Sequence, residues 1–353
     1  MDPAPGDPAT LDLTAHIGAV TLPNPVMTAS GTAGNGAELS SYVDLGRLGA
    51  VVVKSLSVDP WSGNPPPRVH QAAAGMLNSV GLQNPGVAGW LAGELPALAS
   101  TGARVVVSIW AFTTDGYHDA AAAVAAAIRR SGPEVAAIVA VEANISCPNV
   151  EERNAMFAHS ERAAAAATAA AAAGLGGVLP LWVKLSPNVT DLPAIAGSVA
   201  GAGAGALVLT NTLMGLALDP VTGRARLGGG GGGLSGAALH PIAVRAVHDC
   251  RQAHPQVPIV GVGGVSTGED AAEMLAAGAD AVQVGTATFA DPRAPMRVLA
   301  ELAGWCRTHR VAGLADLVGR AHRADLVGRG QPPAPPPSPS PPASASSPPV
   351  ANC

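Results

Sequence analysis

Two lysines and a cysteine stand at points in the sequence where chemistry could be done. Lys54 ends the apolar run VVVKS, and Lys184 ends the run LWVKL. Burying an ammonium group without a partner is costly, so each lysine is expected to face an anion, with surface exposure as the alternative. Cys147 lies in NISCPN between Asn144 and Asn149, whose amides could orient a polar substrate. Its thiol is either a tuned proton acceptor or, as is commoner for a free cysteine, a buried core residue.

Glycine-containing turns near the end of the chain predict a phosphate site. PIVGVGGV (258–265) runs from a strand into a double-glycine turn and a helix, and AVQVGT (281–286) repeats the pattern. Glycine lets the backbone approach an anion closely, and the amino terminus of a helix favours negative charge. The segment 233–236 (GLSG) opens a third helix, whereas the glycine run 228–233 is interpreted as a flexible loop.

Short β-branched runs alternate with Ala- and Leu-rich stretches, which is the pattern of a parallel α/β fold. Eight strands with helices between them favour a (β/α)8 barrel, with a doubly wound sheet as the alternative. In a barrel, the polar residues that follow the strands gather at the carboxyl-terminal rim. The expected strands are 25–29, 50–54, 104–109, 137–144, 181–185, 206–210, 258–262 and 281–284. The expected helices are 116–130, 158–173, 191–201, 236–253, 267–277 and 292–308, two of them capped by Asp191 and Thr267.

Composition bounds the class of protein. The chain has 353 residues, of which 48% are hydrophobic and 13% charged, enough for a sizeable core. A net charge of −5 predicts no bulk attraction to nucleic acid or to an anionic membrane. The uncharged run 163–183 is mostly alanine and is interrupted by glycine and proline, so a helix, a turn and a strand are expected there instead of a membrane span.

The four cysteines are far apart, and no two form a CxxC pair. We therefore expect no metal site, no iron–sulfur cluster within this chain and no disulfide framework, which fits a reducing cytoplasm. They are Cys147, Cys250, Cys306 and Cys353.

The two ends of the chain differ from its middle. Residues 1–12 are expected to be loose and show no signal peptide, and 13–325 are expected to form the catalytic barrel. Residues 331–353 are rich in Pro, Ser and Ala and are predicted to be a disordered tail, with a ligand for a proline-reading domain as the alternative.

Taken together, ten segments resemble the dihydroorotate dehydrogenase family, the flavin enzymes of pyrimidine synthesis, in its soluble class 1 form. VKLSPNVTD and GLQNPG are most similar to class 1B. The resemblance covers about residues 24–307. The segments are NPVMTASGT (24–32), VVVKSLS (51–57), GNPPPRV (63–69), GMLNSVGLQNPGV (75–87), VEANISCPN (141–149), WVKLSPNVTD (182–191), NTLMG (211–215), GGLSG (232–236), GVGGV (261–265) and VGTATF (284–289).

The resemblance implies FMN bound at the barrel rim, where the flavin performs the redox chemistry and the protein orients it. The residues implied to hold the phosphate are Gly236, Gly263, Gly264, Gly285 and Thr286. Those implied to contact or lie near the flavin ring are Ser30, Lys54, Ser55, Ser108, Asn144, Lys184 and Thr210.

The resemblance also implies the oxidation of dihydroorotate to orotate. Cys147 takes the proton from C5 as general base while a hydride leaves C6 for flavin N5. Membrane-bound class 2 enzymes use serine as the base, so the cysteine disfavours that class. The residues implied to hold the substrate are Lys54, Asn78, Ser79, Val80, Gly81, Leu82, Asn144, Asn211 and Thr212.

Several expectations from the resemblance stay open. Ser108 departs from the resemblance, because it occupies a place where the family usually has an asparagine near the flavin. Class 1 barrels are usually homodimers, and class 1B enzymes pair with a subunit that carries FAD and a 2Fe–2S cluster. The electron acceptor is NAD through that partner, fumarate or another molecule. The alternative functions are a related FMN barrel that acts on another dihydropyrimidine and a non-catalytic FMN-binding protein.

Overall fold

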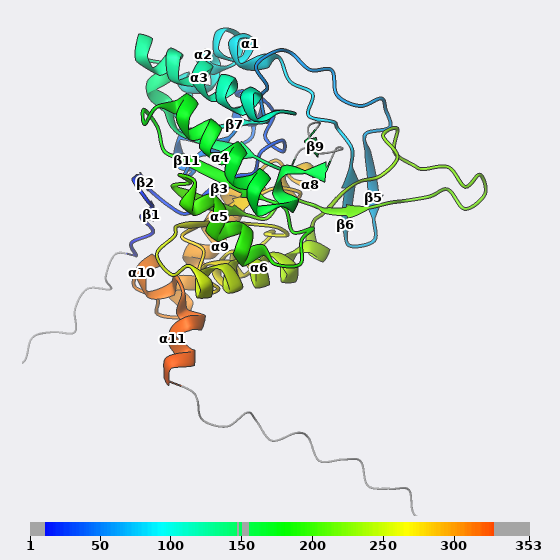
Figure 1. Ribbon diagram of the computed structural model, residues 1–353. Coiled ribbons are helices and arrows are strands. Elements are labelled where there is room, and N and C mark those ends of the chain that lie inside the picture. The colour runs from blue at the N-terminus through cyan, green and yellow to red at the C-terminus, as the bar shows by residue number, and fades with distance from the viewer. Residues whose placement is uncertain (1–10, 147, 150–154, 328–353) are drawn as a thin grey trace, which may run out of the picture.

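The computed structural model describes residues 11–146, 148–149 and 155–327. Within them, eight parallel strands form one sheet in the order β3-β16-β15-β12-β11-β8-β7-β4. The edge strands meet, because Met27 bridges Ala50 and the amide of Gly49 donates to the carbonyl of Val26 at 2.8 Å. The predicted (β/α)8 barrel is therefore confirmed, and the doubly wound alternative is wrong (Figure 1). The strands are β3 (Val26–Thr28), β4 (Val51–Val52), β7 (Val105–Ile109), β8 (Ile138–Asn144), β11 (Leu181–Leu185), β12 (Ala206–Leu209), β15 (Ile259–Val262) and β16 (Ala281–Val284).

Helices surround the barrel (Figure 1). The six expected helices are present as α3, α4, α5, α6, α7 and α9, each with ends within four residues of the prediction. Both predicted caps are confirmed: Asp191 accepts from the amide of Ala194 at 3.0 Å, and Thr267 forms a reciprocal capping box with Asp270. The described α-helices are α1 (Gly86–Gly93), α2 (Leu95–Ser100), α3 (Thr114–Arg130), α4 (Glu161–Leu175), α5 (Leu192–Gly201), α6 (His240–Ala253), α7 (Gly268–Ala276), α8 (Ala287–Ala290), α9 (Ala294–Thr308), α10 (Leu314–Leu317) and α11 (Arg320–Val327). Short 3-10 helices are η1 (Glu38–Ser41), η2 (Leu45–Arg47), η3 (Val135–Ala137), η5 (Phe157–His159) and η6 (Ala237–Leu239).

The core lies inside the barrel and between the barrel and its helices. β7 and β11 are buried at every position, which explains why their sequences show no polar alternation. Successive side chains of a barrel strand point alternately inward and outward, and both directions meet apolar neighbours here.

A second, antiparallel sheet lies beside the carboxyl ends of the barrel strands and was not predicted. It has the order β13-β14-β6-β5 and joins segments more than 130 residues apart. Its strands are β5 (Val69–Ala72), β6 (Gly75–Asn78), β13 (Leu213–Gly215) and β14 (Gly232–Ser235). Two shorter pairs complete the described strands: β1 (Ala15–Ile17) with β2 (Val20–Leu22), and β9 (Pro148–Asn149) with β10 (Ala155–Met156).

The interpretation of residues 228–233 as a flexible loop is wrong for its last two residues, because Gly232 and Gly233 belong to β14. A Cβ on Gly233 would lie 2.0 Å from Oγ1 of Thr212, and one on Gly232 would lie 2.5 Å from the carbonyl oxygen of Asn78. Gly233 therefore lets the sheet lie close to the end of the barrel strand β12, and Gly232 lets β14 lie close to β6.

Residues 11 and 12, the last two of the segment expected to be loose, are held by the barrel. Asp12 bridges Gly313 through hydrogen bonds with Ala312 and Leu314, and Leu11 packs on the core. Residues 1–10 and the predicted tail 331–353 lie outside the described residues. None of the described helices has the length and apolar character needed to span a membrane.

Candidate active site

A cavity of about 530 Å³ opens at the carboxyl ends of the barrel strands. Nearly all the predicted site residues line it, although they come from segments up to 256 residues apart in sequence. Ser108 does not line the cavity but lies buried beneath it, and Cys147 lies outside the described residues, next to the lining residue Ser146. The predicted residues on the cavity wall are Ser30, Lys54, Ser55, Asn78, Ser79, Val80, Gly81, Leu82, Asn144, Lys184, Thr210, Asn211, Thr212, Gly236, Gly263, Gly264, Gly285 and Thr286.

Two asparagines on one wall hold each other in place. Asn144, at the end of β8, accepts a hydrogen bond at its Oδ1 from Nδ2 of Asn211 at 3.0 Å. Oδ1 of Asn211 in turn accepts from the amide of Thr212 at 2.9 Å, and the hydroxyl of Tyr117 donates to the carbonyl of Asn144 at 2.7 Å. Because these contacts fix both amide planes, the wall presents oriented polar groups to a planar polar ligand.

The opposite wall comes from β6 and the loop after it. Nδ2 of Asn78 donates to the carbonyl of Gly233 at 3.3 Å, which ties this wall to β14. Gly81 and Leu82 have φ values of 71° and 63°, so the loop turns sharply toward the cavity. Sequence analysis missed Asn64, whose Nδ2 donates to the hydroxyl of Ser79 at 2.8 Å. It stands inside the quoted segment GNPPPRV, so a polar residue within that match was the available signal.

Three glycines form a cradle of close-packed backbone on a third side. Gly236, Gly263 and Gly264 have φ values of 100°, 145° and 68°, which favour glycine. A Cβ on Gly263 would lie 2.6 Å from the Cβ of Ala243, and one on Gly264 would lie 2.6 Å from the Cβ of His240. Since His240 begins α6, the cradle lies beside a helix amino terminus, a geometry suited to phosphate.

The floor of the cavity is charged and buried. Nζ of Lys184 lies 3.4 Å from Oγ of Ser30 and 3.8 Å from Oε1 of Glu142, which is fully buried inside the barrel. The expected anionic partner of Lys184 is thus present. The sequence analysis did not find Glu142 or its neighbour Gln283, although each is a polar residue inside an apolar strand, the signal that marks such a group.

Lys54 is the second lysine of the cavity, and Gly31 makes room for it. Gly31 has a φ of 79°, and a Cβ there would lie 3.1 Å from Nζ of Lys54. Both residues line the cavity. The small residue after Ser30 therefore lets the lysine side chain lie close to the end of β3.

The two described cysteines are separate from this cavity. Burial raises the pKa of the Cys250 thiol to about 12 and also raises the pKa of the Cys306 thiol. Neither side chain lines the cavity, so neither is a candidate base. In the described part of the chain, no three His, Cys, Asp or Glu side chains are grouped as metal ligands.

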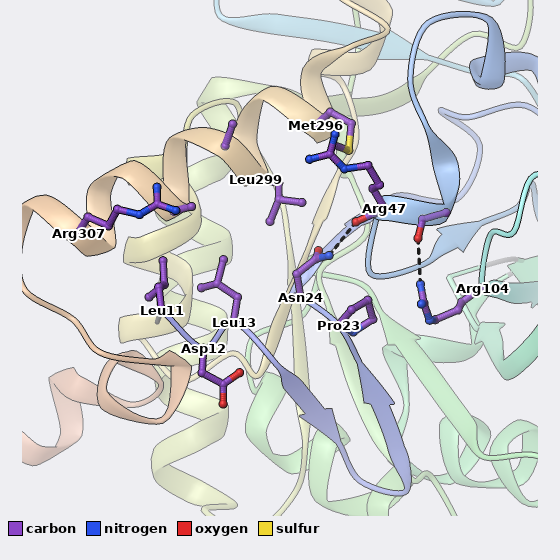
Figure 2. A pocket seen from close by; sticks show the side chains of 13 residues that line it. Leu11, Asp12, Leu13, Pro23, Asn24, Arg47, Arg104, Met296, Leu299 and Arg307 are labelled. Carbon is purple, nitrogen blue, oxygen red and sulfur yellow. Dashed lines mark hydrogen bonds between the residues drawn. The ribbon is translucent and has the colours of Figure 1, made fainter. Parts of the chain in front are cut away.

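A second cavity, of about 650 Å³, lies at the amino ends of the strands (Figure 2). Its wall combines apolar residues such as Leu13, Met296 and Leu299 with the polar residues Asp12 and Asn24 and three arginines. Of its three arginines, Arg104 donates to the carbonyls of Gly46 and Leu48, while Arg47 and Arg307 are exposed. It contains none of the predicted site residues, so the larger volume does not make it the better candidate.

The family model for dihydroorotate dehydrogenase matches residues 12–305. The chain belongs to the dihydroorotate dehydrogenase family. Members of this family are flavin-dependent oxidoreductases of pyrimidine biosynthesis that act on CH–CH donors, so the enzyme class, the flavoprotein character and the dihydroorotate dehydrogenase function predicted from the sequence are confirmed at the level of the family.

Curated relatives of this dihydroorotate dehydrogenase family member match over most of its length. It is 45% identical to the dihydroorotate dehydrogenase B (NAD(+)) catalytic subunit of Desulforudis audaxviator, over 87% of this chain and 96% of the relative. It is 42% identical to the protein of the same name from Pelobacter propionicus, over 87% and 98%. A relative from Solibacter usitatus, provisionally named dihydroorotate dehydrogenase A (fumarate), is 44% identical over 88% and 98%.

Proposed function

We propose that this protein oxidises dihydroorotate to orotate with FMN bound at the barrel rim. The observation that carries the proposal is the convergence, in one cavity, of a glycine cradle, two lysines and three asparagine amides from separate strands. A cradle for a phosphate, a cation for a carboxylate and amides for a ring of alternating C=O and N–H groups are the three kinds of contact that this reaction needs.

Two features of the cavity fit FMN. Gly236, Gly263 and Gly264 have positive φ values, and a Cβ on any of them would press on neighbouring protein atoms, so glycine gives the backbone the shape that a phosphate would need. Oγ1 of Thr210 is buried at the cavity with no hydrogen-bond partner among the described residues, so a bound polar ring edge would satisfy it. Ser30, Ser55 and Lys184 provide the remaining polar contacts, with Gly285 and Thr286 at the phosphate. When bound, the flavin supplies the acceptor for the hydride that leaves C6 of the substrate.

The substrate would lie between the two walls of amides. Asn78, Asn144, Asn211 and Thr212 offer donors and acceptors to the pyrimidine ring, while residues 79–82 form the edge of the binding site. The ammonium group of Lys54 would bind the substrate carboxylate through a charge-assisted hydrogen bond. A pyrimidine ring without a carboxylate could not make this contact.

The proton from C5 would go to Cys147. The residue itself lies outside the described residues, but Ser146 before it and Met156, which follows the same segment, both line the cavity. A thiolate accepts the proton only within hydrogen-bond reach, so the protein must hold the substrate with C5 facing this segment.

The test is anaerobic reduction of the purified yellow protein by its substrate. Dihydroorotate is expected to bleach the flavin absorbance, whereas dihydrouracil, which lacks the carboxylate that Lys54 would bind, is expected to bleach it much more slowly. Equal rates with both compounds would favour the alternative of a barrel acting on another dihydropyrimidine. A protein that carries no flavin would overturn the proposal.

The second part of the proposal concerns the electron acceptor, which depends on whether a partner subunit is present. The relatives named as catalytic subunits are named with NAD(+), and the Solibacter relative is named with fumarate. We expect a class 1B arrangement in which a subunit with FAD and a 2Fe–2S cluster passes electrons to NAD. Turnover assays with NAD and with fumarate, with and without co-purifying protein, distinguish the two.

A homodimer and a cytoplasmic location complete the proposal. The connection between β13 and β14 projects from the barrel and exposes Leu216, Leu218 and Val221 (Figure 1). A second copy of the chain would cover this apolar surface, and sedimentation of the purified protein tests the homodimer.

The cytoplasmic location is supported by the free thiols of Cys250 and Cys306, which fit a reducing compartment.

A further inference from the structure

Beneath the cavity floor, a buried carboxylate takes no direct part in the proposed reaction. Glu142 lies in β8 two residues before Asn144, so both side chains point to the same side of the strand, one layer apart. Its side chain has no exposed surface, and a carboxylate in that setting is costly unless it is paired and hydrogen-bonded.

Glu142 is paired and hydrogen-bonded. Its Oε2 accepts from Nε2 of Gln283 at 2.8 Å, and its Oε1 accepts from the hydroxyl of Ser108 at 3.5 Å. Nζ of Lys184 lies 3.8 Å from Oε1 and also donates to Oε1 of Gln283 at 3.4 Å. Because the pair lies at the cavity floor with Lys184 nearer the cavity, the charge of Glu142 acts on whatever Lys184 faces.

The same network reaches the substrate wall. Oγ of Ser108 is 2.8 Å from Oγ of Ser55, and Nδ2 of Asn144 donates to Oγ of Ser55 at 3.4 Å. The Ser108 hydroxyl thus links Glu142 to Ser55 in the cavity wall. This is a role for the serine at a position where the family usually has an asparagine.

We propose that Glu142 is a positioning residue that balances the charge of Lys184 and so sets the reduction potential of the flavin; this rests on the proposed function. Lys184 beside the ring favours the electron-rich reduced form, and Glu142 opposes it by making the buried pair neutral. Removing the carboxylate charge leaves the pair with a net charge of +1 and raises the potential. Removing the lysine charge leaves −1 and lowers it.

The experiment measures the midpoint potential of the bound flavin by anaerobic redox titration. Glu142→Gln is expected to shift the potential to more positive values and Lys184→Met to more negative values. The double variant, in which the pair is again neutral, is expected to lie between them and near the original protein. A structural role alone would predict no such reversal of sign. Glu161→Gln, the same change on the exposed first turn of α4, is the control and is expected to leave the potential unchanged.

A second matched pair separates charge from packing, should Glu142→Gln fail to fold. Glu142→Asp and Glu142→Asn shorten the side chain equally but differ in charge. The potential of the Asn variant is expected to be the more positive of the two. Dissociation constants for FMN, from titration of the apoprotein, show whether each variant keeps its site.

The outcomes are distinguishable. If the unaltered protein binds no flavin, the proposed function fails. If it binds flavin but Glu142→Gln, or the Asn variant relative to the Asp variant, leaves the potential unchanged or makes it more negative, the role of Glu142 is overturned while the proposed function stands.

Discussion

The two ends of the barrel each carry a cavity, and the difference between them shows what identifies a site. The rim cavity measures about 530 Å³ and the basal cavity about 650 Å³. Buried polar groups such as Lys184 and Asn144 line the rim cavity, whereas Arg47 and Arg307 of the basal cavity are exposed (Figure 2). Volume therefore does not distinguish them. What does is the gathering of buried polar groups at the rim, one of which, the hydroxyl of Thr210, has no hydrogen-bond partner among the described residues.

The largest expected effect at the rim is the loss of the base. Cys147→Ala is expected to slow anaerobic bleaching of the flavin by dihydroorotate by about 10²- to 10⁴-fold, because no group is left to take the C5 proton. Stopped-flow absorbance measures the rate, and an unchanged flavin spectrum before mixing is the control for folding. Reduction at the original rate would remove the cysteine from the mechanism.

A comparison of two glycine-to-alanine variants tests whether the shape of the cradle depends on glycine. Gly263→Ala introduces a Cβ 2.6 Å from that of Ala243 at a φ of 145°. The strain, about 1–3 kcal/mol, is expected to weaken FMN binding by roughly 5- to 150-fold. Gly304→Ala, in α9 with open space around the new Cβ, is the matched control. It is expected to keep FMN binding and to raise the free energy of unfolding by up to about 1 kcal/mol. Titration of apoprotein with FMN and thermal unfolding measure both, and equal FMN affinities would contradict the cradle.

Lys54→Met tests which cation at the rim meets the carboxylate. Loss of one charge-assisted hydrogen bond is expected to raise the dissociation constant for orotate by about 10- to 100-fold, with FMN still bound. Perturbation of the flavin spectrum on titration with orotate reports the constant. An unchanged affinity would place the carboxylate elsewhere in the cavity.

The smallest effect is expected at the base. The double variant Arg47→Ala, Arg307→Ala removes two exposed cations from the basal cavity. It is expected to change kcat/KM for dihydroorotate by less than about twofold, as surface substitutions usually do. A large loss of activity would show that the two ends of the barrel are coupled and that the contrast between them is incomplete.

The sequence by itself determined the strands, most of the helices and the identity of the rim. Each barrel strand is a local apolar run. Lys54 and Asn211 stand just after their strands and Lys184 near the end of β11, so any closed parallel barrel brings them to one end. Local propensity and the order of elements suffice for that, because strand direction alone decides which end of the barrel a residue occupies.

The tertiary structure alone decided which buried groups lie beneath the rim cavity and which strands form the sheet beside it. Gln283 reaches Glu142 across 141 residues of sequence, and Asn78 meets Gly233 across 155. Such contacts depend on the closure and register of the barrel and on the pairing of β6 with β14, neither of which any single segment encodes. Ser108 is a further example. The sequence predicts that it lies in a barrel strand, but its position beneath the cavity depends on the neighbouring strands that carry Ser55 and Glu142.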